Sequence, residues 1–169
     1  MQGFGNVDFV VAEIQDGLVK DFISVEAQTV DITGSYRSVY DAWLVDADLA
    51  KSPSFGLNWD NVYKRYVTQL IRKGFYHHHW DTKIVALMQD EVFNYIHGKF
   101  PFLTTPNIGD PAANVVFLLY KYGKGENRWS LEFDRCVGTS HANLSQAALY
   151  AKAPERKAFE GKILESLSR

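Results

Sequence analysis

Two stretches near the N-terminus, Val7-Asp-Phe-Val-Val-Ala-Glu-Ile14 and Phe22-Ile-Ser-Val-Glu-Ala-Gln-Thr-Val30, decide the predicted fold of this chain. Both are rich in β-branched and aromatic residues, which favour β-strands. Asp16-Gly17 lies between them and is a dipeptide typical of tight hairpin turns. We therefore predict an antiparallel hairpin over residues 7–30, in which the numbers of paired residues sum to about 34–36.

Acidic and amide side chains meet on this hairpin. Glu26 and Gln28 are two positions apart, so they point to the same face of their strand. The predicted register places Asp8 opposite residues 26–28, and opposed residues have Cβ atoms about 4.5–5.5 Å apart. Two carboxylates at that spacing can share a Mg²⁺ ion, which prefers oxygen ligands. The spacing alone also fits two solvated carboxylates on a strand.

The clearest helix is predicted over residues 58–73, where apolar side chains recur at helical spacing. Gly74 suits the left-handed residue that follows a helix. The face away from the apolar stripe is expected to carry Lys64, Arg65, Arg72 and Lys73.

The remaining elements alternate between strands and helices, so a mixed α/β fold in one domain over residues 1–169 is predicted. The run at 83–88 is uninterruptedly apolar, as expected for a strand that is covered on both faces. Three prolines and two glycines make residues 98–114 a loop or a small insertion. The other predicted elements are a short helix over 90–97, a hairpin of Val115–Tyr122 with Arg128–Phe133, and helices over Leu144–Ala151 and Pro154–Ser168.

Composition limits the class of protein. The 169 residues include 46% hydrophobic residues, enough for a buried core, and a formal charge of −2 excludes a polycation that coats DNA nonspecifically. One cysteine, Cys136, excludes a disulfide framework and a four-cysteine metal site. The sequence shows neither a secretory signal nor an apolar run long enough to span a bilayer. We expect a cytoplasmic protein with no membrane and no organic cofactor.

A longer sequence motif indicates a more specific class of function. Asp8, followed by Phe22-Ile-Ser-Val-Glu-Ala-Gln-Thr-Val-Asp-Ile-Thr-Gly-Ser-Tyr-Arg37, resembles the active-site region of NotI-like type II restriction endonucleases, and the resemblance covers roughly residues 6 to 90. These enzymes belong to the PD-(D/E)xK nuclease superfamily, with glutamine in place of the lysine and a Thr-x-Asp-x-Thr-Gly segment after it. Asn58-Trp-Asp-Asn-Val-Tyr-Lys-Arg65 and Gln69-Leu-Ile-x-Lys-Gly74 also resemble the helix that follows in the family.

The resemblance implies a prokaryotic, Mg²⁺-dependent enzyme that cleaves double-stranded DNA at a palindromic site as a homodimer. Asp8 and Glu26 would bind the metal with the carbonyl group of Ala27, and Gln28 would occupy the lysine position. The implied fold is a restriction-endonuclease-like core, a mixed central sheet flanked by helices. Candidate DNA-binding residues are Tyr36, Arg37, Lys64, Arg65, Arg72, Lys73, Lys124 and Arg128.

The sequence also departs from the family pattern. Only seven residues precede Asp8, so we expect this sequence to lack the N-terminal helix of the family core, and Cys136 cannot build the cysteine-ligated iron site of the family. We therefore expect the C-terminal catalytic part of a longer enzyme. A catalytically inactive remnant that binds DNA or a partner chain is the alternative, and a nuclease for repair or transposon resolution is a third.

Two further motifs have simpler interpretations. His77-His-His79 cannot aim three rings at one ion on a regular element, so polar loop surface or phosphate contact is expected there rather than metal binding. Glu13 and Gln15 repeat the Glu-x-Gln spacing on the strand of Asp8, close to the turn, and this repeat is interpreted as coincidental.

Overall fold

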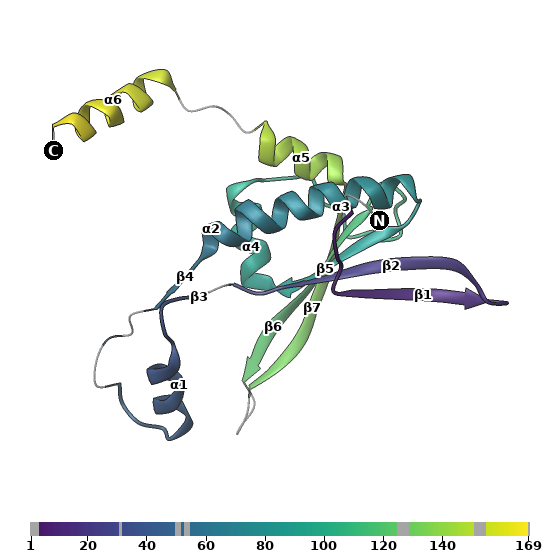
Figure 1. Cartoon of the computed structure of the whole chain (residues 1–169), viewed down its shortest axis with the longest axis horizontal. Helices are drawn as coiled ribbons and strands as arrows, with labels where there is room; N and C mark the ends of the chain where they lie inside the picture. The colour runs from purple at the N-terminus through teal and green to yellow at the C-terminus, as the bar shows by residue number, and fades with distance from the viewer. Residues whose placement is uncertain are drawn as a thin grey trace.

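The computed structural model describes residues 4–30, 32–49, 52, 55–124, 129–150 and 155–168. These residues form a five-stranded sheet of order β1-β2-β5-β6-β7 and a two-stranded sheet, β3-β4 (Figure 1). The strands are β1 Phe9–Gln15, β2 Leu18–Gln28, β3 Ile32–Thr33, β4 Gly56–Leu57, β5 Lys83–Gln89, β6 Val115–Lys124 and β7 Trp129–Thr139. The helices are α1 Arg37–Leu44, α2 Trp59–Asn61, the π-helical segment η1 Val62–Val67, α3 Thr68–His79, α4 Asp90–Lys99, α5 His141–Leu149 and α6 Arg156–Leu167.

The β1–β2 hairpin forms as predicted. Asp16 and Gly17 both have positive φ, 53° and 76°, as the two central residues of a type I′ turn require. Phe9 pairs with Val25, and the sum of 34 holds along β1 until a bulge after Glu13 shifts it by one. The predicted register is therefore confirmed. β2 begins at Leu18, before the predicted Phe22, because a two-residue turn lets pairing start at once.

Strands β2, β5 and β6 run parallel, whereas β1 and β7 are antiparallel to their neighbours. Parallel neighbours require a crossover connection. The chain between β2 and β5 crosses through α2, η1 and α3, and the chain between β5 and β6 crosses through α4. The sheet is therefore mixed and flanked by helices, and the predicted fold class is confirmed.

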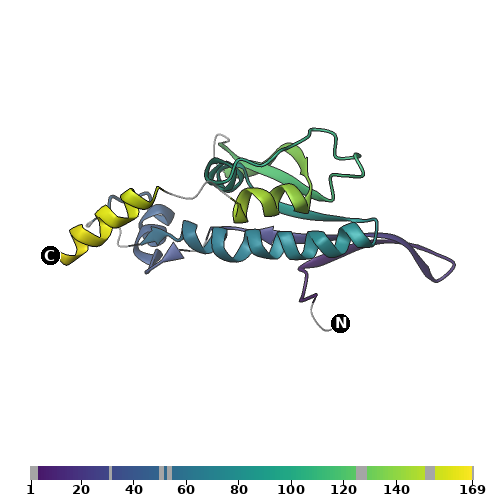
Figure 2. The same ribbon diagram turned by 90° about the horizontal axis from the view of Figure 1, so that it is seen from above.

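The core lies between the sheet and helices α3, α4 and α5. Alternate residues of β5 and β6 face these helices and are almost fully buried: Ile84, Ala86, Met88, Val115, Phe117 and Leu119. They join one cluster with Leu70 of α3, Phe93 of α4 and Leu144 of α5. Figure 2 shows α3 and α5 side by side on the sheet.

The prediction that residues 83–88 are covered on both faces is wrong. The intervening residues of β5, such as Val85 and Leu87, are only partly buried. The core helices pack against the opposite face, so the apolar run is fully buried on one side only.

The predicted end of the long helix is also wrong, because α3 continues past Gly74 to His79. Gly74 is buried inside the helix, and a Cβ atom there would lie 2.9 Å from His141 Cβ and 2.9 Å from Val115 Cγ2. The glycine therefore permits a close approach of α3 to α5 and β6 rather than a left-handed cap. The three consecutive histidines lie in the last helical turn, not in a loop.

The second hairpin extends further than predicted, since β7 continues from Phe133 to Thr139. Residues 100–114 separate α4 from β6 and pair with the sheet through an isolated bridge between Thr105 and Gly138. A helix, α1, forms where the sequence signals are mixed. Pro154, the predicted start of the last helix, lies outside the described residues. Among the helices of the described residues, none is long and apolar enough to cross a membrane.

Candidate active site

The predicted pair of carboxylates lies where β1 begins and β2 ends. Asp8 directly precedes the first residue of β1, and the register of the hairpin continues to Glu26 as its opposite residue. Asp8 Oδ2 accepts a hydrogen bond of 2.8 Å from the backbone N–H of Ala27. The Asp8 carboxylate is therefore held beside residues 26 and 27. Asp8 is exposed, whereas Glu26 is only 7% exposed.

Glu26 faces the helical layer. Glu26 pairs with Ala86 of β5, and the side chain of Ala86 lies in the core. Ser24 and Gln28, two residues before and after Glu26, share this face of β2. A carboxylate buried here needs a partner, because an unpaired buried charge is costly. The partner is Lys73 of α3, whose ammonium group contacts Glu26 Oε1.

Lys73 also contacts the strand of Asp8. Its Nζ atom donates a hydrogen bond of 2.6 Å to the backbone carbonyl of Asn6, two residues before Asp8. One ammonium group therefore joins α3 to the end of β2 and to the chain that enters β1. The prediction that Lys73 lies on the face away from the apolar stripe is wrong, because only 6% of Lys73 is exposed.

Extending the apolar stripe would have revealed this position. Tyr66, Leu70, Lys73 and His77 follow one another at intervals of three or four residues and are all buried. A helix that ends before Gly74 leaves His77 out of this pattern. The sequence contains the signal, but a glycine near the end of a helix also predicts a left-handed cap, which obscures it.

Tyr66 completes the surroundings of Glu26. Its hydroxyl group donates a hydrogen bond of 3.2 Å to the backbone carbonyl of Glu26. Burial raises the pKa of the Tyr66 hydroxyl far above its ordinary value of 10, and the negative charges of Glu26 and Asp8 raise it further. Tyr66 therefore stays a neutral donor, and both carboxylates contribute to the negative potential around it.

Gln28 lies on the same face as Glu26 and is partly buried. Its side-chain amide contacts the backbone carbonyl of the neighbouring Thr29. An amide offers both donors and an acceptor but carries no charge.

A buried hydrogen-bond chain supports the site from behind. His77 Nδ1 lies 2.8 Å from the carbonyl of Lys73, so this nitrogen carries the proton of the neutral ring, and Nε2 accepts from Ser24 Oγ at 2.8 Å. Burial lowers the pKa of His77, against a smaller opposing effect of its bond to the Lys73 carbonyl. The neutral ring thus connects α3 to β2 one turn beyond Lys73.

The remaining predicted DNA-binding residues are distributed over several elements. Lys64, Arg65 and Arg72 are exposed on η1 and α3, away from the core. Tyr36 and Arg37 lie at the start of α1, where Arg37 pairs with Asp41 at 3.8 Å. The side chain of Lys124 and the whole of Arg128 lie outside the described residues.

The three histidines at the end of α3 differ in environment. His77 is buried, whereas His78 and His79 are exposed. In the part of the chain that the structure describes, no cluster of three or more histidine, cysteine or acidic side chains could hold a metal ion. Asp8 and Glu26 are only two acidic residues, fewer than the three that such a cluster requires.

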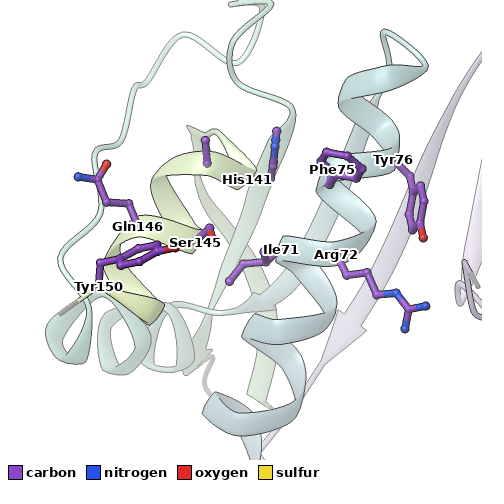
Figure 3. Close-up of a pocket in the computed structure, with 9 residues that line it drawn as sticks. Ile71, Arg72, Phe75, Tyr76, His141, Ser145, Gln146 and Tyr150 are labelled. Carbon is purple, nitrogen blue, oxygen red and sulfur yellow. The ribbon is translucent and has the colours of Figure 1, made fainter.

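A pocket of about 660 Å³ lies elsewhere, between α3 and α5. Figure 3 shows Ile71 of α3 between the two helices, with Tyr150 and Ser145 on the α5 side. Arg72 and Tyr76 also line the pocket, but their side chains point away from α5 (Figure 3). Of the residues that the structure describes, no acidic one lines this pocket, so it includes neither Asp8 nor Glu26.

The mixed five-stranded sheet flanked by helices is consistent with the restriction-endonuclease-like class of fold. Within that class, the chain belongs to the restriction endonuclease NotI family, whose model matches residues 2–133. The match extends well beyond residues 6 to 90, where the sequence resemblance is clearest. A search of curated proteins found no significant match. Family membership identifies a hydrolase that cleaves DNA at specific sites, with DNA as its substrate.

Proposed function

We propose that this chain hydrolyses double-stranded DNA at a palindromic site, as a homodimer, with Mg²⁺ held by Asp8, Glu26 and the carbonyl group of Ala27. The proposal assigns the site to the Glu-x-Gln variant of the PD-(D/E)xK pattern. The hydrogen bond from the Ala27 N–H to Asp8 Oδ2 is the observation that carries it. This bond holds the Asp8 carboxylate against the backbone of Ala27, the residue after Glu26 on the adjoining strand.

The donor set fits Mg²⁺. Two carboxylates and a backbone carbonyl are hard oxygen ligands, and Mg²⁺ characteristically binds few protein ligands and keeps several waters. Asp8 is exposed, which leaves the pair open to solvent on one side. When bound, the ion supplies positive charge for the phosphate oxygens and lowers the pKa of a bound water.

Gln28, Glu26 and Asp8 would have different roles in the hydrolysis of the phosphodiester bond. Water attacks the phosphorus atom and the bond to the 3′ oxygen breaks, so that a 5′-phosphate and a 3′-hydroxyl group result. Gln28 would orient the water or a phosphate oxygen through hydrogen bonds, but its amide cannot take a proton. Glu26 and Asp8 would hold the metal in place.

DNA binding is assigned chiefly to exposed cationic side chains on the helices. Lys64, Arg65 and Arg72 follow one helical segment and would contact phosphates, which position the duplex without reading its sequence. Tyr36 and Arg37, on α1, would contact the backbone near the scissile bond. Lys124 and Arg128 are candidates for base contacts in the major groove.

Plasmid cleavage with Mg²⁺ tests the proposal. Asp8→Ala and Glu26→Ala should each reduce the cleavage rate by at least about a hundredfold, because either change removes a metal ligand. Chelation of the metal with EDTA should abolish cleavage by the unmodified chain. Discrete fragments from genomic DNA would show that the cleavage is site-specific.

Glu13→Ala is the matched control. Glu13 belongs to the repeated Glu-x-Gln spacing, but it lies on exposed β1 close to the turn, so its removal should leave the rate unchanged. Cleavage that survives both Asp8→Ala and Glu26→Ala would refute the site. DNA binding without cleavage, and without any effect of Mg²⁺ or Ca²⁺ on affinity, would favour the alternative of a non-catalytic DNA-binding chain.

A further inference from the structure

A buried ammonium group lies between the two strands that carry the carboxylates. Lys73 Nζ contacts Glu26 Oε1 and the carbonyl of Asn6, and the side chains of Lys73 and Glu26 are 7% and 9% exposed. Burying a lysine costs more than burying an apolar side chain of similar size unless its charge is compensated. A residue that only tied α3 to the sheet would not need a charge.

The strand residues of the site carry no positive charge. Asp8 and Glu26 are acidic, and Gln28 is neutral. Two carboxylates on neighbouring strands repel each other and would also repel the phosphates of DNA. Of the side chains described here, Lys73 supplies the cationic contact to Glu26, and it does so from a helix 47 residues further along the chain.

We infer that Lys73 is a positioning residue of the active site. Its ammonium group is the internal counter-ion of Glu26, and a divalent cation that binds Glu26 must do so against the repulsion of this positive charge. The inference rests on the proposed function, since it takes Asp8 and Glu26 as the cation ligands. Without a divalent cation, Lys73 contacts the buried carboxylate and holds it in place. With the cation bound, two positive charges share the same carboxylates.

This arrangement has an unusual consequence. Removal of the Lys73 charge should tighten cation binding, because the repulsion between the ammonium group and the cation disappears. At the same time the chain without a cation should become less stable, because Glu26 then lies buried without a partner. A lysine with a merely structural role would give a different result, since its loss would loosen the site and weaken cation binding.

Titration of Mn²⁺ into the full chain without DNA tests the inference, with free Mn²⁺ measured by electron paramagnetic resonance at pH 8. Lys73→Met should lower the Mn²⁺ dissociation constant on the order of tenfold. The rise in Tm between EDTA and Mn²⁺ should be larger for Lys73→Met than for the unmodified chain. Lys73→Gln keeps polar contacts to Asn6 and Glu26, so it serves if the methionine variant does not fold.

Lys20→Met is the matched control, because it removes an exposed lysine from the far end of β2. Its Mn²⁺ affinity should equal that of the unmodified chain. Equal or weaker Mn²⁺ binding by both Lys73 variants, with the same loss of Tm in EDTA and in Mn²⁺, would overturn the inference alone. Absence of Mn²⁺ binding by the unmodified chain, or binding that Asp8→Asn and Glu26→Gln leave unchanged, would overturn the proposed metal site and the inference together.

Discussion

Gly74 has no side chain, and its neighbours fill the space that a methyl group would need. Gly74→Ala would place Cβ 2.9 Å from His141 Cβ and from Val115 Cγ2, neither of which is the end of a flexible side chain. Overpacking costs about 1–3 kcal/mol, while alanine gains about 1 kcal/mol in helix propensity. We expect a net loss on the order of 1 kcal/mol in the free energy of unfolding, measured by urea denaturation.

Gly98→Ala provides the comparison for this prediction. Gly98 lies in α4, and a Cβ atom there would meet nothing within 4 Å. The same substitution should therefore stabilise the protein, by up to about 1 kcal/mol. Similar effects at both positions would show that α3 does not pack closely on α5 and β6.

The site itself was predictable from sequence only in part. Asp8 and Glu26 could be brought together because a two-residue turn at Asp16 and Gly17 fixes the register of every later pair. Lys73 could not be assigned in the same way. Its contact with Glu26 depends on how a helix lies across the sheet, and no local rule of pairing links the two residues.

At the scale of elements, the contact between α3 and β2 should depend on pH. The pKa of His77 is lowered from its ordinary value of 6.5, mainly by burial, so the unfolded chain binds a proton more readily than the folded one. The contribution of the neutral His77 ring to the free energy of unfolding is fully present above about pH 6.5 and is lost as the pH falls toward the lowered pKa. We expect Tm to fall between pH 7.5 and pH 5, measured by circular dichroism.

His77→Gln keeps a donor for the Lys73 carbonyl and an acceptor for Ser24, but it does not titrate. Its Tm should therefore change less over the same pH range. Some dependence should remain, because burial and the neighbouring His78 and His79 lower the pKa of His141 as well. An identical pH dependence of Tm in the variant and the unmodified chain would show that protonation of His77 does not cause the fall in Tm.

The elements were predicted best where a local pattern is strong. Alternation and turn residues located the β1–β2 hairpin, and apolar spacing located the helix that ends in α3. The end of that helix was misjudged, because a glycine can mark either a left-handed cap or a close contact between elements. Only the approach of His141 and Val115 distinguishes the two.

At the scale of the whole molecule, the β1–β2 hairpin leaves apolar side chains in contact with water. β1 is one of the two edge strands of the sheet, and all of its residues are exposed. Phe9 and Val11 are 62% and 59% exposed. Long apolar edge strands tend to pair with other chains. We expect concentration-dependent self-association, measurable by static light scattering.

Val11→Lys should reduce this association, since a charged side chain on an edge strand opposes pairing. The substitution removes little buried surface, so Tm should stay within about 1 °C of the unmodified value. Association that is unchanged by the lysine would show that β1 is not the surface involved.

Gly74 and Lys73 are consecutive residues, and this adjacency couples two distant parts of the molecule. An α-helix rises about 1.5 Å per residue, so the depth to which α3 settles against Val115 and His141 also sets the reach of the next side chain toward β2. If the proposed metal site is correct, mutants selected for an altered requirement for divalent ions should therefore include changes at Val115 or His141, which pack against Gly74. The packing of α3 against α5 and β6 therefore sets the position of the Lys73 ammonium group beside Glu26.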